Sequence, residues 1–85
     1  MDVTKLPFDT DAMLAGLRPW VECESPTWDA MRVDAMMDVA ARDLALCGAR
    51  IERIGGRLGF GDCVRATFAT GNASEPGILI MGHLD

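Results

Sequence analysis

Hydrophobic residues recur at three- and four-residue spacing in two stretches of the N-terminal half of the chain. The first stretch starts after Thr10 and Asp11, which can cap a helix, and ends near Glu22. Pro19 lies inside it, removes one backbone donor and crowds the carbonyl of Ala15, so we expect a kink or a restart there. The apolar stripe of this expected helix consists of Met13, Leu14, Leu17, Trp20 and Val21.

A second and more regular stripe follows a strong helix-start signal. The residues Ser25, Pro26 and Thr27 predict the start, because either hydroxyl can serve as the N-cap and proline is tolerated in a first turn. Gly48 is well placed as the C-terminal cap. We expect the methionines of this helix to fill a core rather than form a binding surface. The stripe consists of Val33, Met36, Met37, Ala40, Leu44 and Cys47.

Two strands and a turn are expected next. Residues 49–54 alternate polar and apolar, which predicts a strand with one wet face near a sheet edge, and residues 63–69 predict a second strand. The segment from Gly55 to Gly61 contains four glycines. No Lys-Ser/Thr pair and no helix follow them, so they predict a hairpin loop and not a phosphate-binding loop. A polar loop is expected over 71–77.

The run Ile78–Met81 predicts a strand that is apolar on both faces, as inside an α/β sheet. The expected order is therefore α-α-β-β-β, and the fold class is α/β. A strand of this kind needs a neighbouring strand at each edge and helices over both faces, whereas only two helices and two other strands are expected. We therefore expect one face or one edge of it to lie open, and the fold to be incomplete.

Composition excludes some classes of partner. The 85 residues carry a net charge of −5 with eight scattered basic residues, which argues against nucleic acid and anionic membranes. The N-terminus lacks the pattern of a targeting segment, and no apolar run is long enough to span a bilayer. Cys23, Cys47 and Cys63 lack CxxC spacing. We expect three reduced, mostly buried thiols in a cytoplasmic protein.

The candidate chemistry lies at Gly82-His83-Leu84-Asp85, directly after the apolar run. The carboxyl end of a central α/β strand is where active sites are usually built. A metal-bound histidine usually donates its second ring N–H to a carboxylate, and a spacing of two residues suits that contact. From the spacing alone, His83 and Asp85 are equally well explained as a metal ligand with its supporting carboxylate or as a structural pair.

The stretch from Trp20 to Thr27, the long helix, the two strands and the final Ile78–Asp85 together resemble the N-terminus of a family of zinc exopeptidases. That family includes glutamate carboxypeptidase, acetylornithine deacetylase, succinyl-diaminopimelate desuccinylase and carnosinase-like dipeptidases. The first stretch, which reads Trp-Val-Glu-Cys-Glu-Ser-Pro-Thr, is most similar to bacterial glutamate carboxypeptidases. The resemblance covers essentially all of this chain, but only about a fifth to a quarter of a full family member.

The resemblance implies that residues 1–85 are the N-terminal portion of the catalytic domain of a two-domain enzyme. His83 would be a ligand of one of two zinc ions, and Asp85 would be an active-site residue that supports it. The bridging aspartate, the glutamate base, the other ligands and the dimer-forming lid domain would lie beyond position 85, so this chain alone is expected to be inactive. The substrate would be a small peptide or an N-acyl amino acid, cleaved at an amide bond next to a free carboxylate, and the full protein a homodimer.

Two alternatives belong to other classes. One is a non-catalytic remnant of such an enzyme. The other is a small α/β binding module in which His83 and Asp85 form a structural pair. In-frame coding sequence after Asp85 with a bridging aspartate and a Glu-Glu pair favours the enzyme, and an immediate stop favours the remnant.

Overall fold

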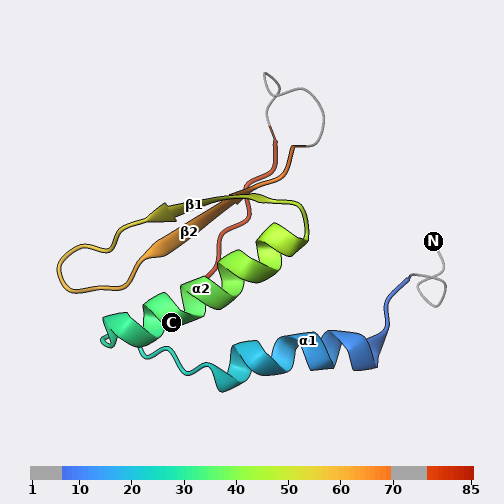
Figure 1. The fold of residues 1–85 in the computed structure, drawn as a ribbon, viewed down its shortest axis with the longest axis horizontal. Coiled ribbons are helices and arrows are strands. Elements are labelled where there is room, and N and C mark those ends of the chain that lie inside the picture. Colours follow the sequence, from blue (N-terminus) through green and yellow to red (C-terminus); the bar gives the residue numbers. More distant parts are fainter. Residues whose placement is uncertain (1–6, 70–76) are drawn as a thin grey trace.

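The computed structural model describes residues 7–69 and 77–85 and contains two helices and a two-stranded sheet. Helix α2 (Ala30–Leu46) lies between helix α1 (Thr10–Glu22) and the hairpin of β1 (Arg50–Ile54) and β2 (Cys63–Thr67) (Figure 1). The fold is therefore mixed α/β, as predicted, and four of the five expected elements are present.

Helix α1 is capped one residue earlier than expected. The Asp9 carboxylate accepts from the backbone N–H groups of Asp11 and Ala12 at 3.0 and 3.2 Å. Of the kink or restart predicted at Pro19, the restart is wrong, because the helix continues through Pro19 to Glu22. Pro19 lies in the last turn, where its carbonyl still accepts from the Cys23 N–H. No residue of α1, which the structure describes in full, is buried.

Helix α2 forms the centre of the molecule. Its inward face buries Val33, Met36 and Ala40, which are 6%, 2% and 1% exposed, as the stripe predicted. Its C-terminus is closed by Gly48 at a φ of +97°. The N–H groups of Gly48 and Ala49 donate to the carbonyls of Ala45 and Leu44, the pair of bonds that defines a Schellman motif.

The hairpin was predicted in position, whereas the predicted alternation of burial is seen in β2 and not in β1. Strands β1 and β2 pair antiparallel, with Arg53 opposite Val64 and Glu52 opposite Arg65. Arg53 contacts α2, so alternation places Glu52 and Arg65 on the outer, solvated face. Gly61 in the connecting loop lies so close to α2 that a Cβ there would be 2.4 Å from Val33 Cγ1. The glycine thus permits the close approach of loop and helix.

The predicted strand at Ile78–Met81 is wrong for the structure as it stands. Residues 77–85 have no regular secondary structure, and the side chains of 78–81 are 78–94% exposed. A doubly apolar strand forms only where neighbours hydrogen-bond its edges and cover its faces, and the described residues offer it too few. The predicted open apolar surface is confirmed. The polar loop expected over 71–77 falls largely outside the described residues.

The packing is correspondingly loose. The Cα radius of gyration is 15.4 Å, against about 12 Å for a compact domain of this length. Apolar side chains of α1, such as Leu14 and Val21, remain exposed alongside those of 78–81. In the part of the chain that is described, no helix is long and apolar enough to cross a membrane.

The cysteines are less buried than predicted. Cys23, Cys47 and Cys63, which all lie within the described ranges, are free thiols, and only Cys23 is partly covered. Cys47 is exposed because it lies at the cap of α2. Cys63 is exposed because it is opposite Ile54 on the outer face of the hairpin.

Candidate functional site

His83 and Asp85 face one another at the end of the C-terminal segment. His83 Nδ1 lies 3.4 Å from Asp85 Oδ1, slightly beyond an optimal hydrogen bond. The histidine side chain is 92% exposed and the aspartate 31%. The contact places the carboxylate on the Nδ1 side of the ring, so the Nε2 atom points away from it. A histidine that binds a metal through Nε2 has this arrangement.

The carboxylate of Asp85 is held by a second partner. A hydrogen bond from the Thr27 hydroxyl is the main reason why the pKa of Asp85 lies below its usual value of 3.8. Partial burial opposes this shift, while the backbone N–H of Asp85 and the nearby His83 add to it. Asp85 is therefore ionised at neutral pH, as an acceptor for a histidine N–H must be.

The turn that contains Thr27 makes a further contact with the same segment. The Ser25 hydroxyl donates to the backbone carbonyl of Leu84, across a sequence separation of 59 residues. The sequence predicted that Ser25 or Thr27 caps α2, but neither residue does. Asp29 does so instead, with its carboxylate accepting from the Arg32 N–H at 3.2 Å. No local signal in the sequence reports that the two hydroxyls bind a distant segment.

A cavity of about 590 Å³ lies between the C-terminal segment and the rest of the molecule. Apolar side chains of α2 and β2 line one side of it, including Val33, Met37 and Val64. His83 and Asp85 belong to its lining on the other side. The pair is thus next to a space in which a ligand or a further segment of chain can sit.

The pair could supply one ligand of a zinc site together with the carboxylate that supports it. Imidazole nitrogen and carboxylate oxygen are suitable donors, and Asp85 orients the ring in the required sense. Within residues 7–69 and 77–85, however, no three His, Cys, Asp or Glu side chains are close enough to hold a metal ion together. Zinc takes four ligands, of which a catalytic site draws three from the protein, so these ranges do not complete one.

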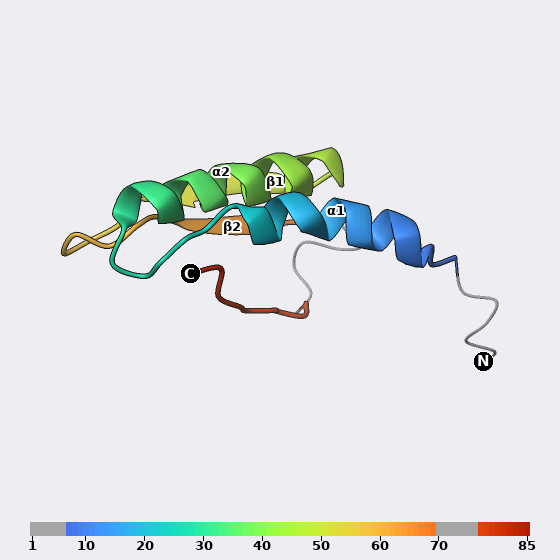
Figure 2. The ribbon, with the colours of Figure 1, turned by 90° about the horizontal axis from the view of Figure 1, so that it is seen from below.

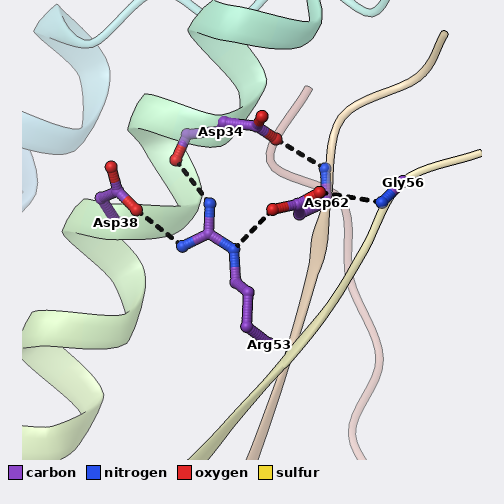
Figure 3. A network of polar contacts seen from close by, with 5 residues as sticks. All are labelled: Asp34, Asp38, Arg53, Gly56 and Asp62. Carbon is purple, nitrogen blue, oxygen red and sulfur yellow. Dashed lines mark hydrogen bonds and ion pairs between the residues drawn. The ribbon is translucent and has the colours of Figure 1, made fainter.

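A second polar cluster, which sequence reasoning missed, surrounds Arg53 (Figure 3). The guanidinium donates to Asp38 at 2.6 Å, to Asp62 at 3.1 Å and to the carbonyl of Asp34 at 3.0 Å. Asp62 also accepts from the N–H of Gly56 at 2.8 Å. The hydrogen bond to Asp38 is the main cause that raises the pKa of Arg53. The spacing of Asp34 and Asp38 on one helix face was the available signal.

The Arg53 cluster is a structural joint between the hairpin and α2. Arg53 is paired with two carboxylates, those of Asp38 and Asp62, and each donor of Arg53 named above already has a protein acceptor. The candidate site is therefore the His83–Asp85 pair with its neighbouring turn. No family model, no curated protein and no solved structure matches this chain.

Proposed function

We propose that residues 1–85 are the N-terminal portion of the catalytic domain of a zinc-dependent exopeptidase similar to glutamate carboxypeptidase. The complete enzyme would hydrolyse an amide bond next to a free carboxylate, in a small peptide or an N-acyl amino acid. His83 would be one zinc ligand. The observation that carries the proposal is the placement of the Asp85 carboxylate on the Nδ1 side of His83, directly after an apolar run.

The residues of this chain have a limited and definable part in such a reaction. Asp85, ionised at neutral pH, would accept a hydrogen bond from Nδ1–H of His83 and thereby favour the tautomer whose Nε2 lone pair points outward. Zinc, when bound, would lower the pKa of a coordinated water so that hydroxide is available near neutral pH. The other ligands, the glutamate base and the lid domain would come from residues after 85. The full protein would be a cytoplasmic homodimer.

The exposed run of residues 78–81 supports the same proposal. Four consecutive large apolar side chains in solvent are unusual unless another surface covers them. The rest of a catalytic domain would supply neighbouring strands and helices and convert this run into the buried strand that its composition favours. His83 and Asp85 would then lie at the carboxyl end of that strand.

Zinc titration followed by ¹⁵N NMR of the imidazole tests the proposal. His83 is the only histidine, so its two ring nitrogens are unambiguous. We expect weak binding, with zinc shifting Nε2 while Nδ1 stays protonated. In Asp85→Asn the affinity at His83 should fall by roughly 10–100-fold. His83→Ala is the control and should remove the response.

Two results would contradict the proposal. One is zinc that binds without affecting the imidazole, or that binds through Nδ1. The other is one tight, stoichiometric zinc that survives dialysis, because a single histidine with one carboxylate cannot hold it. That outcome would show that the chain completes a metal site by itself.

A small binding module remains the second candidate, favoured by the contact of the Ser25 hydroxyl with the Leu84 carbonyl, which needs no metal. In that case His83 and Asp85 are a structural pair. A module of this kind unfolds as a monomer in one sharp thermal transition at micromolar concentration. The exopeptidase portion should instead self-associate or melt gradually, because its apolar surface is open.

A further inference from the structure

We propose that α1 pairs with α1 of a second copy of this chain, antiparallel and across a two-fold axis. The proposal goes beyond the proposed function, which assigns no role to this helix. The occupant of the open face of α1 is the same face of another molecule.

The exposed face of α1 carries a narrow stripe of four residues. They follow one another at spacings of four, three and four positions, so at about 100° per residue they lie within an arc of about 60°. This alternation is typical of the seam that two paired helices bury between them. The stripe consists of Thr10, Leu14, Leu17 and Val21. Its three apolar members are 64%, 54% and 69% exposed in chain order.

The two halves of α1 have different surroundings. The N-terminal half extends beyond α2 in both ribbon views, whereas the C-terminal half lies beside α2 (Figure 1 and Figure 2). A hollow of about 530 Å³ borders the C-terminal half, and its lining includes Leu17, Val21, Met36 and Leu84. An antiparallel pair lays the projecting half of each α1 along the hollow of the other copy. Both features belong to one chain, so a single two-fold operation matches them twice.

One register brings the whole stripe into contact. With the two-fold axis between residues 15 and 16, Leu14 lies opposite the partner's Leu17, and Thr10 lies opposite the partner's Val21. On one flank of the stripe, Met13 comes beside the partner's Trp20. Met13 is 61% exposed, and the Trp20 indole is half-buried and fixed to Asp43. The flank therefore adds a mobile apolar side chain against an aromatic ring that is already held.

Charge favours the same direction and register. Asp11 and Arg18 lie on the other flank of the stripe, and antiparallel pairing brings each beside its counterpart in the partner. The Arg18 side chain is 77% exposed, and its guanidinium has donors beyond the one that binds Glu22 at 2.7 Å. A parallel pair would instead set this charged flank against the apolar flank of Met13 and Trp20.

The exposed surface is large enough for such an interface. The chain has an accessible surface of 7370 Å², against about 4,900 Å² for a folded monomer of this length. Each partner of a standard protein interface contributes about 800 Å². The excess is therefore more than a helix pair with its neighbouring hollows would bury.

Sedimentation equilibrium of the full chain at micromolar concentrations tests the proposal. We expect a monomer–dimer equilibrium whose Kd rises by more than about 100-fold in Leu14→Gln, because each dimer loses two buried leucines. Glutamine and leucine have similar helix propensities, so α1 should be kept. Leu46→Gln, where the side chain is 80% exposed at the end of α2, is the matched control and should leave the Kd unchanged. Leu79→Gln should also leave it unchanged, which excludes residues 78–81 as the interface.

A mixing experiment tests the direction of the pair. Asp11→Arg and Arg18→Asp should each weaken the homodimer by roughly tenfold, because like charges then meet at two contacts. An equimolar mixture of the two variants should form a heterodimer about as tight as the intact dimer, since opposite charges meet again. In mixed labelled and unlabelled intact chain, intermolecular NOEs should join the methyl groups of Thr10 and Val21. Within one helix these residues are about 16 Å apart, too far for an NOE.

Several results would overturn the helix pair. They are a monomer at every concentration, a dimer that persists in Leu14→Gln, a dimer that Leu79→Gln dissociates, and a mixture that forms no heterodimer. If Leu14→Gln loses helical circular dichroism, the mixing experiment decides. The zinc response of His83 should be the same in Leu14→Gln as in the intact chain. Its absence from both would contradict the proposed function and leave the helix pair standing.

Discussion

The unit formed by α2 and the hairpin differs sharply from the two outer segments, α1 and residues 77–85. The first has a buried helix face, a closed helix end and a cluster of charges that joins its parts. The outer segments have equally apolar sequences but leave most of that surface in solvent. They are held by few contacts, chiefly Trp20 to Asp43 at 2.6 Å and the Ser25 hydroxyl to the Leu84 carbonyl.

The difference shows that an apolar pattern specifies a structure only when a partner surface is present. The stripe of α2 meets the hairpin, and a small core forms. The stripe of α1 and the run of residues 78–81 contact few other residues and remain exposed to solvent. The candidate site is on the open side, where its geometry depends on a few polar contacts.

The largest expected effect comes from emptying the core. Met36→Ala should cost about 2–5 kcal/mol, because the side chain is almost fully buried and a cavity would remain. In so small a domain this should abolish cooperative structure. Met31→Ala on the same helix, where the side chain is 84% exposed, is the matched control and should change little. Urea unfolding followed by circular dichroism measures both, and equal losses would show that α2 has no packed face.

Glycine-to-alanine substitutions should change the stability in opposite directions in the two regions. Gly61→Ala should destabilise by about 1–3 kcal/mol, because its Cβ would collide with Val33. Gly16→Ala in α1 meets nothing within 4 Å and should stabilise by about 0.5–1 kcal/mol. Thermal melts of both variants check the pair. If both variants change the stability in the same direction, the loop does not pack on α2 as described.

Arg53→Gln should loosen the joint between the hairpin and α2. We expect a loss of about 1–2 kcal/mol, because three acceptors lose their donor, although partial exposure reduces the effect. Arg65→Gln removes only the exposed pair with Glu52 and should cost less stability than Arg53→Gln. Denaturant midpoints of the two variants give the comparison. A larger loss for Arg65 would contradict the central role of the Arg53 cluster.

The smallest expected effect concerns pH and the attachment of α1. The Trp20 indole N–H is the main reason why the pKa of Asp43 lies below 3.8, with Arg42 adding to the shift and burial opposing it. A lowered folded-state pKa contributes stability above the unfolded pKa of about 4, and this is lost as the pH falls through the lowered value. Trp20→Phe should therefore raise the pKa of Asp43.

An NMR titration of the Asp43 carboxyl carbon measures this shift. Trp28→Phe is the control, because the Trp28 ring packs at a tilt against Phe60, with centroids 5.4 Å apart, and within the described residues makes no hydrogen bond to Asp43. An unchanged pKa of Asp43 in Trp20→Phe would mean that α1 is not attached to α2 through this bond.

The parts of the fold that the sequence predicted are those set by local chemistry. The stripe of α2, the left-handed glycine at 48 and the glycine-rich hairpin are each encoded within a few residues. The N-cap of α2 was misassigned because Ser25 satisfies a carbonyl far along the chain instead of the helix. The strand at 78–81 failed for a related reason, since its formation depends on neighbours that lie elsewhere.

The sequence pointed to a contact between His83 and Asp85 but not to the residues that surround it. The spacing of His83 and Asp85 is consistent with the contact that the structure contains. The contact of Ser25 with Leu84 was not predictable, because a hydroxyl next to a proline is a common helix-start signal and its long-range partner leaves no local pattern. Arg53 was missed because it appeared only as one polar position in an alternating strand.

Amide hydrogen exchange of the intact chain tests the central claim, that the site lies on an open region attached to a packed one. We expect amides of α2, β1 and β2 to share the highest protection, and those of residues 78–81 to exchange at nearly the rate of an unfolded chain. Protection of 78–81 equal to that of α2 would contradict the account, because that run would then already be part of the core.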